Sequence, residues 1–387
     1  MKSSFIYGAK RTPIGSFMGS LASVSAPQLG AQVVKALVSE AGLKGSEFQG
    51  AIVGCVLPAG LGQAPARQVV IFAGLPQSVP AVTINKVCGS GLKAVSMAFD
   101  QVALGRADCL MAGGIENMSQ APYYLKTARA GFRMGHQEVS DGMIMDGLWD
   151  VYNQFHMGTA AEMCAKEYKF SREAQDAYAR ESYERALKSI EAGLFKNEIV
   201  SVEVKVKKEI KRIDTDEEPG KSDLSKFSDL RPAFDAQGSI TAANASSLND
   251  GAAMVIVGSE NPGFGAKPLA RILHAAEFAQ APAWFSTAPV ACIKKLLQEA
   301  SLKVSDIKVF EINEAFSAVA MAAQKELDIP RDRLNPRGGA VALGHPIGAS
   351  GTRILVSLLH QLQKGEKGVA SLCIGGGEAI AMLVEKL

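Results

Sequence analysis

The sequence lacks any apolar run of the roughly 18–20 residues that a membrane-spanning helix needs. It also lacks an excess of one charge, because 41 Lys and Arg residues face 39 Asp and Glu residues. The resulting net charge of +2 argues against non-specific binding to nucleic acid or to membranes. Residues 1–6 resemble a short strand and not a secretion signal, and Glu385-Lys386-Leu387 only half matches the Ser-Lys-Leu peroxisomal address. We therefore expect a cytoplasmic protein.

The six cysteines form no C-x-x-C pair, and no histidine stands at zinc-finger spacing from them. We expect neither a structural metal site nor, in so long a chain without a secretion signal, a disulfide framework. Four cysteines are expected to be small buried side chains: Cys55, Cys109, Cys164 and Cys292. Cys88 and Cys373 differ, because each lies beside glycines.

Short apolar runs alternate with amphipathic stretches, which predicts an α/β protein. At 387 residues the chain is long for one core, so two or three domains are expected. The strands we predict with most support lie at residues 51–56, 109–112, 309–312 and 370–374. The corresponding helices lie at residues 91–104, 174–192, 290–299 and 351–363.

Two stretches of the chain resemble each other. Ser90-Gly91-Leu92-Lys93 opens a helix, and the following strand is predicted to end at Gly113-Gly114. Ser350-Gly351-Thr352-Arg353 opens another, and its strand ends at Gly375-Gly376-Gly377. The match predicts two similar halves with a site between them.

A polar segment of about residues 119–246 separates the two halves. Within it, residues 205–218 are dense in charge and predict a solvated hairpin or loop. Four basic or titratable residues lie near its start and suit contact with a phosphorylated ligand: Lys126, Arg129, Arg133 and His136.

Three glycine-rich motifs hold the candidate catalytic residues. They are Val87-Cys88-Gly89-Ser90-Gly91, Gly344-His345-Pro346-Ile347-Gly348 and Cys373-Ile374-Gly375-Gly376-Gly377. One thiol can hold an acyl group, the other can move a proton, and the histidine can activate the first. Glycines let backbone N–H groups approach a small carbonyl closely. The set suits chemistry that makes or breaks a carbon–carbon bond beside a thioester.

Each of these residues also has a structural interpretation. Cys88, at a predicted helix N-terminus that would stabilise its thiolate, could equally be a core cysteine at a strand–helix joint. His345 suits proton exchange with a thiol near neutral pH, although a lone histidine is more often structural. Cys373 could be an acid/base thiol, with the N–H of Gly375 beside it as an oxyanion donor, or it could be a buried strand residue. Asn313 is a helix N-cap or holds a water against an oxyanion.

The motifs resemble those of the thiolase family, and most closely its biosynthetic acetoacetyl-CoA thiolases. The resemblance covers nearly the whole chain and is borne by the three motifs above and five further ones: Gly113-Gly114-Ile115-Glu116-Asn117-Met118-Ser119, Phe155-His156-Met157-Gly158, Leu230-Arg231-Pro232-Ala233-Phe234-Asp235, Asn244-Ala245-Ser246 and Asn313-Glu314-Ala315-Phe316.

The resemblance implies two βαβαβαββ halves in a layered α/β/α/β/α core. The first half would comprise residues 1–118 and 247–266, and the second residues 267–387. Residues 119–246 would form an inserted loop domain that holds much of the coenzyme A site. The resemblance also implies a homotetramer, with its contact near residues 126–136.

The implied activity is reversible condensation of two acetyl-CoA to acetoacetyl-CoA by a ping-pong route through acetyl-Cys88. His345 would activate Cys88, Cys373 would deprotonate the second acetyl-CoA, and Asn313 would hold a water at the enolate. Coenzyme A is then a substrate, and no prosthetic group or metal is expected. Candidate contacts to coenzyme A are Ser246, His156, Met157 and Phe234, with Lys221 where the family often has an arginine.

Four residues depart from the family pattern: Ser247, Phe285, Glu378 and Ala379. Ser247 and Phe285 are expected to reshape the channel or the acyl pocket. Glu378 must be paired, exposed or protonated, and Ala379 would cost about 1 kcal/mol if its φ were positive.

Three rival functions remain at this point. A degradative thiolase of broad chain length uses the same residues. A decarboxylating ketoacyl synthase needs a histidine where Cys373 stands. A non-catalytic CoA- or lipid-binding member would lack one of the catalytic thiols.

Overall fold

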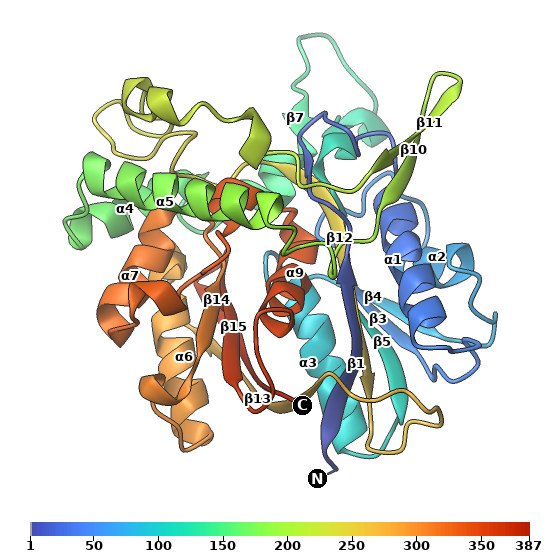
Figure 1. Cartoon of the computed structure of the whole chain (residues 1–387). Coiled ribbons are helices and arrows are strands. Elements are labelled where there is room, and N and C mark those ends of the chain that lie inside the picture. The colour runs from blue at the N-terminus through green and yellow to red at the C-terminus, as the bar shows by residue number, and fades with distance from the viewer. Residues whose placement is uncertain (1) are drawn as a thin grey trace.

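The computed structural model describes residues 2–387, and their main sheet has two similar halves (Figure 1). The first half has the strand order β1-β12-β5-β3-β4, with β1 at Ser4–Arg11, β12 at Asn249–Gly258, β5 at Cys109–Asn117, β3 at Ala51–Gly54 and β4 at Ala81–Ile84. The second has the order β13-β16-β15-β14, with β13 at Ala270–Ala279, β16 at Glu378–Lys386, β15 at Lys367–Ile374 and β14 at Val309–Ile312. β1 pairs antiparallel with β13 where the halves join, and the short β2 (Gly15–Ser16) extends β12.

The pairing directions repeat between the halves. β3 pairs parallel to β5 and β4, and β14 pairs parallel to β15, whereas the other neighbours within each half are antiparallel. Leu334 forms a parallel bridge with Phe310 at the place that β4 occupies in the first half. The predicted repeat therefore corresponds to two halves of one topology.

Helices cover both faces of each half-sheet, as Figure 1 shows. α1 (Ala26–Glu40) and α2 (Pro65–Phe72) pack on the outer face of the first half, and α6 (Ala288–Glu299) and α7 (Ser317–Leu327) on the outer face of the second. α3 (Ser90–Ala103) and α9 (Ile347–Leu359) lie between the half-sheets. The result is the predicted α/β/α/β/α arrangement.

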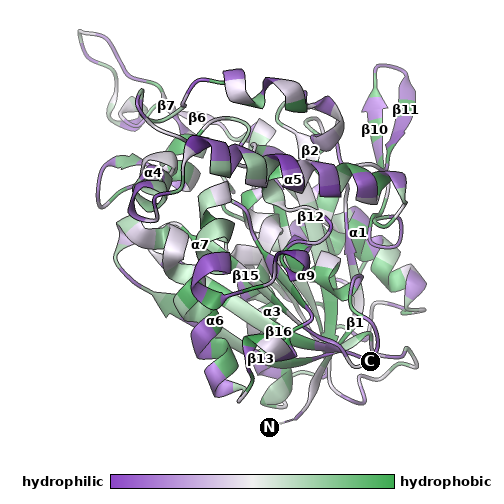
Figure 2. Cartoon of the chain, turned by 60° about the vertical axis from the view of Figure 1, so that its left-hand side comes forward, coloured by the Kyte–Doolittle hydropathy of each residue, from purple (hydrophilic) through white to green (hydrophobic). Residues whose placement is uncertain are grey.

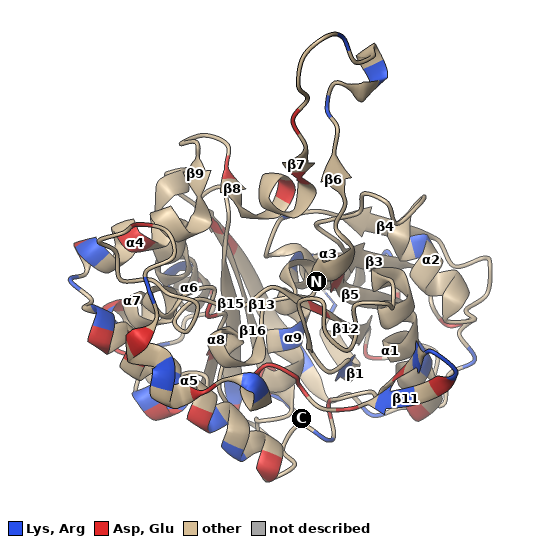
Figure 3. Ribbon diagram, turned by 90° about the horizontal axis from the view of Figure 1, so that it is seen from above, with Lys and Arg blue, Asp and Glu red and all other residues tan. Residues whose placement is uncertain are grey.

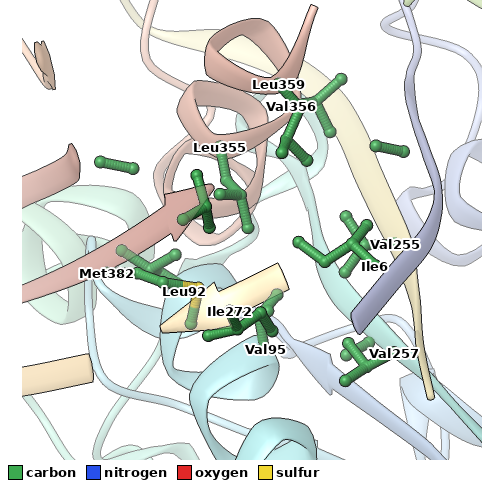
Figure 4. Close-up of a cluster of buried hydrophobic side chains, with 14 of the residues drawn as sticks. Ile6, Leu92, Val95, Val255, Val257, Ile272, Leu355, Val356, Leu359 and Met382 are labelled. Atoms are coloured by element: carbon green, nitrogen blue, oxygen red, sulfur yellow. The ribbon is translucent and has the colours of Figure 1, made fainter. Parts of the chain in front are cut away.

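The central layer holds the largest apolar cluster. Figure 4 shows Ile6 and Val255 of the first half-sheet and Met382 of the second around Leu92 of α3 and Leu355 of α9. Strands covered by helices on both faces are nearly continuous apolar runs, and all ten residues of β12 are buried, including Asn249 and Asp250 at its start. Figure 2 shows this as hydrophobic colour on the inner strands and hydrophilic colour on much of α5 (Arg172–Glu191).

Glycines allow α3 and α9 to cross closely. A Cβ on Gly91 would lie 2.9 Å from the carbonyl oxygen of Gly348, and one on Gly351 would lie 2.6 Å from the backbone nitrogen of Leu92. Real Cβ atoms do not approach backbone so closely, so only glycine fits at this crossing. The crossing places the N-termini of both helices side by side.

The polar middle segment lies across one end of the core. It contains α4 (Met157–Glu167), α5 and four short hairpin strands, which are β6 at Tyr123–Tyr124, β7 at Ser140–Asp141, β8 at Trp149–Asp150 and β9 at Phe155–His156. The loop between β6 and β7 extends away from the body and carries basic residues (Figure 3). β10 (Val202–Val206) and β11 (Glu209–Ile213) form the exposed hairpin that the charge-dense stretch predicted.

Several predicted boundaries were wrong. β3 ends at Gly54 and not at residue 56, and α9 ends at Leu359 and not at residue 363. β5 continues through Gly113 and Gly114 to Asn117, because these glycines serve close packing and not a turn: a Cβ on Gly114 would lie 2.0 Å from the carbonyl oxygen of Gly348. α9 begins at Ile347, four residues earlier than predicted, because Pro346 acts as its N-cap. The four-residue helix α8 (Ala340–Leu343) precedes it. Within residues 2–387, no helix combines the length and apolar character that crossing a bilayer requires.

Candidate active site

A single cavity of about 390 Å³ brings together Cys88, His345 and Gly375. Side chains from the middle segment form much of its remaining wall. Among the described residues, its lining includes no Lys, Arg, Asp or Glu, so the walls are predominantly apolar. The cavity thus lies between the two halves, as the repeat predicted, and under the middle segment.

Cys88 lies in a tight turn directly before α3. Val87 adopts a positive φ of 46°, and the Ser90 hydroxyl accepts from the N–H of Lys86 (2.8 Å) while donating to the carbonyl of Val87 (2.7 Å). The backbone N–H groups of Gly375 and of Cys88 itself are directed at the thiol and lower its pKa, but burial outweighs them and raises the pKa to about 11. The predicted stabilisation of the thiolate by the helix terminus is therefore not enough to ionise Cys88.

His345 is held from two sides. The backbone N–H of His345 donates to Asn249 Oδ1 at 2.8 Å. The preceding Gly344, with a φ of +102°, leaves room for the Asn249 side chain, since a Cβ on Gly344 would lie 2.4 Å from Asn249 Oδ1. The ring Nδ1 lies 2.6 Å from the Ser350 hydroxyl, which itself donates to the carbonyl of Pro346 at 2.9 Å. Because that hydroxyl proton is already used, His345 Nδ1 carries the proton, and Nε2 is left free to act as a base.

Burial lowers the pKa of His345 to about 3, and the nearby charge of Arg353 lowers it further in the same direction. His345 is therefore neutral at neutral pH. The sequence suggested a histidine that titrates near pH 7, whereas the structure holds it in the form that can accept a proton from a neutral thiol.

Cys373 lies one residue before the end of β15 and is fully buried. Burial raises the pKa of its thiol well above the ordinary value, and the charge of a Cys88 thiolate raises it further. Cys373 is not among the residues that line the cavity. Gly375, Gly376 and Gly377 form the turn between β15 and β16, with positive φ at the last two. The Gly375 N–H is thereby presented to Cys88.

Asn313 follows β14 and lies against His345, with Nδ2 3.4 Å from Nδ1 of the ring and 3.5 Å from Nε2. The N-cap of α7 is Phe316, so the interpretation of Asn313 as a helix cap was wrong. Within the described residues, Asn313 Oδ1 has no hydrogen-bond partner. Its neighbour Glu314 fixes this segment by accepting from the Tyr178 hydroxyl at 2.9 Å and the Ser182 hydroxyl at 2.7 Å.

Four of the five candidate coenzyme A contacts line the cavity: Ser246, His156, Met157 and Phe234. His156 caps α4 by accepting the N–H of Gly158 at 3.0 Å, and its ring stacks on Phe234 with centroids 4.7 Å apart. Lys221 is not among the lining residues. Its amine instead contacts Glu217 at 2.5 Å and Ser16 at 3.1 Å.

The structure places each of the four residues that depart from the family pattern. Ser247 lines the cavity and donates to Asn249 Oδ1 at 2.9 Å. Phe285 is buried in the apolar cluster that contains Cys373. Glu378 forms an ion pair with Lys86, two residues before Cys88. Ala379 lies in β16 opposite Cys373, with extended backbone, so the expected strain is absent.

Reasoning from sequence missed the residues that orient His345. Asn249 begins β12, where an Asn-Asp-Gly run looks like an ordinary turn signal, and it lies 96 positions away in the chain. Ser350 stands inside the glycine-rich motif, but its role depends on how α9 starts. The only signal in the sequence for either role is a polar residue beside an otherwise apolar run.

The five-layer core of two halves and the partly buried Cys88 thiol in the cavity between them define the class as an α/β acyltransferase. Comparison with known proteins identifies the family. The family model for the thiolase N-terminal domain matches residues 4–261, and that for the thiolase C-terminal domain matches residues 266–386. The chain belongs to the thiolase family.

Curated relatives and solved structures agree with this assignment. A probable acetyl-CoA acyltransferase of Staphylococcus aureus is 47% identical over 98% of each chain, and an acetyl-CoA acetyltransferase of Allochromatium vinosum is 47% identical over 99% of this chain and 98% of its own. The Acat5 thiolase from Ascaris suum in complex with coenzyme A has a TM-score of 0.95 at 43% identity over the whole of both chains. The Bacillus anthracis acetyl-CoA acetyltransferase has a TM-score of 0.97 at 38% identity, covering 100% of this chain and 99% of that one.

Proposed function

We propose that the protein is an acetyl-CoA C-acetyltransferase that reversibly condenses two acetyl-CoA molecules to acetoacetyl-CoA and CoA. The observation that carries the proposal is the convergence of the Cys88 thiol, neutral His345 and the Gly375 N–H on one predominantly apolar cavity. The names of the relatives agree with it.

In the first half-reaction, Nε2 of His345 takes the proton from Cys88, and the thiolate attacks the thioester carbon of acetyl-CoA. The N–H groups of Cys88 and Gly375 stabilise the oxyanion, each donor contributing roughly 3–4 kcal/mol to the transition state. The Cys373 thiol protonates the departing CoA sulfur, so that acetyl-Cys88, a Cys373 thiolate and His345 protonated on Nε2 remain. Because the pKa of the thiol is about 11, this proton transfer is required at neutral pH.

In the second half-reaction, the Cys373 thiolate removes a proton from the methyl group of another acetyl-CoA. The Nε2–H of protonated His345 and a water held by Asn313 stabilise the enolate oxygen. The carbanion attacks acetyl-Cys88, Cys88 is expelled and takes its proton back from His345, and acetoacetyl-CoA departs. The influence of a Cys88 thiolate on the pKa of Cys373, which it raises beyond the effect of burial, supports this division of labour.

The walls of the cavity favour a short acyl group on a slender arm. Phe285 and Phe316 pack with ring centroids 6.3 Å apart in the cluster that contains Cys373, which limits space beside the reacting thiols. Ser246, His156, Met157 and Phe234 provide a mostly apolar surface suited to the pantetheine arm of coenzyme A. Lys221 is a weaker candidate, since its amine is already paired.

We further propose a cytoplasmic homotetramer that uses coenzyme A as substrate and needs no prosthetic group. β6 exposes Tyr123, and the basic loop that follows it exposes Phe132 and Met134, which suits a contact between subunits. Light scattering of the purified protein tests the assembly, and a monomer or an isolated dimer would contradict it.

The decisive experiment is CoA-dependent cleavage of 3-ketoacyl-CoAs of about four to sixteen carbons, with Cys88→Ala as the control. Activity confined to acetoacetyl-CoA supports the proposal. Comparable activity on long chains would indicate a degradative thiolase. A binding protein would be indicated by two results together: no activity on any substrate, and alkylation of Cys88 by iodoacetamide that acetyl-CoA does not suppress.

A further inference from the structure

Beneath the cavity lies a carboxylate to which the mechanism above gives no task. Glu116, near the end of β5, is fully buried. Its Oε2 accepts the backbone N–H groups of Val56 (3.0 Å) and Gly348 (2.9 Å), and its Oε1 accepts the N–H of Leu57 (3.2 Å) and the thiol of Cys55 (3.7 Å). All four partners are donors, so the arrangement suits a carboxylate that accepts every bond.

The bond to Gly348 completes the start of α9. The N-cap of this 13-residue helix is Pro346, which offers no side-chain cap to the free N–H groups of the first turn. Glu116 supplies an acceptor there from another element, which stabilises a helix N-terminus. Burial raises the pKa of its carboxyl to about 7, so the stabilising negative charge is only partly present at neutral pH. A Cβ on Gly348 would lie 2.5 Å from Glu116 Oε2, so the glycine is what permits the contact.

The same carboxylate also orders the surroundings of both reacting residues. Val56 and Leu57, whose N–H groups it binds, belong to an apolar cluster with Ile347, and Cys88 packs against this cluster. His345 is thus fixed at its own N–H by Asn249 and, three residues later, at Gly348 by Glu116.

We propose that Glu116 is a positioning residue of the thiolase reaction, which sets the His345–Gly348 turn so that the imidazole faces Cys88. It acts through the backbone of Gly348 and touches neither the acyl group nor coenzyme A. Its loss shifts the base and leaves the cavity wall in place, so the effect falls on kcat and not on KM. A displacement of about 1 Å at a reacting group is enough to lower a rate roughly 100-fold.

The test compares Glu116→Ala, Glu116→Gln and Glu116→Asp in acetoacetyl-CoA thiolysis. We expect the Ala variant to lower kcat about 100-fold with KM within about threefold. The Gln variant keeps an amide oxygen for Gly348 and should recover kcat to within about tenfold of the wild type. Glu198→Gln is the matched control: Glu198 is equally buried and accepts from Arg11 (2.6 Å) and Ser357 (2.9 Å), but it makes no bond to the His345–Gly348 turn.

Two results would overturn the inference. One is a Glu116→Ala enzyme with kcat within about threefold of the wild type. The other is that all Glu116 variants show a lower kcat, a changed KM and a lower melting temperature together, and that Glu198→Gln shows the same changes. If the Ala variant does not fold, Glu116→Asp decides, because its shorter side chain keeps the charge but withdraws from Gly348. Full activity of the Asp variant would then refute the inference.

The inference rests on the role proposed for His345, so His345→Ala is measured alongside. An active His345→Ala enzyme would defeat the proposed function itself. An inactive His345→Ala enzyme beside a fully active Glu116→Ala enzyme would defeat only the role of Glu116.

Discussion

The oxyanion donor at Gly375 can be removed without changing any side chain of the wild-type cavity. Replacing Gly375 with proline deletes the N–H that is directed at the Cys88 thiol. The preceding residue, Ile374, already lies in β15 and so has the extended conformation that a following proline requires. A new Cβ has room, since the nearest atoms to it are Met157 Sδ at 3.4 Å and Val87 Cγ1 at 3.6 Å, and the ring Cδ takes the place of the N–H hydrogen.

The expected loss follows from the energy of one oxyanion donor. Removing such a donor costs about 2.7–4 kcal/mol of transition-state stabilisation, which corresponds to a fall of roughly 100- to 1,000-fold in kcat. Gly375→Ala is the matched control, because it adds a Cβ at the same place and keeps the N–H. We expect kcat of the Ala variant to remain within about tenfold of the wild type.

The assay is steady-state thiolysis of acetoacetyl-CoA, with burst kinetics to measure acylation of Cys88 separately. Melting temperatures of both variants establish that the turn between β15 and β16 is intact. A Gly375→Pro enzyme that is folded and has the same kcat as Gly375→Ala would refute the assignment of this N–H to the oxyanion hole.

Three further predictions follow from the same site. Cys373→Ala should still form acetyl-Cys88 from labelled acetyl-CoA but make no acetoacetyl-CoA, and synthesis at the wild-type rate would refute the role of that thiol. In His345→Ala, the rate of alkylation of Cys88 by iodoacetamide should rise about tenfold per pH unit between pH 7 and 10, because the pKa of the thiol, about 11, lies above this range. A rate that levels off below pH 8 would contradict the raised pKa. Phe285→Met should increase cleavage of six-carbon relative to four-carbon substrates by roughly tenfold, and an unchanged ratio would show that this ring does not limit chain length.

The sequence alone determined the α/β class and the two similar halves, and it singled out the candidate reacting groups. These features are local: alternating apolar runs reveal strands and helices, and glycine-rich motifs around Cys88, His345 and Cys373 mark backbone that approaches a ligand. The exposed hairpin was likewise predicted from its charge density, because a segment so rich in charge stays in solvent whatever elements pack nearby.

Only the tertiary structure decided how these groups behave. The sequence suggested a stabilised thiolate at Cys88 and a histidine titrating near pH 7, whereas burial raises the pKa of Cys88 to about 11 and lowers that of His345 to about 3. Desolvation depends on every element packed around a group, so no local pattern reports it. The same holds for Gly113 and Gly114, which look like a turn and prove to be packing contacts, and for the bond from Glu116 to Gly348, whose partners lie 232 positions apart in the chain.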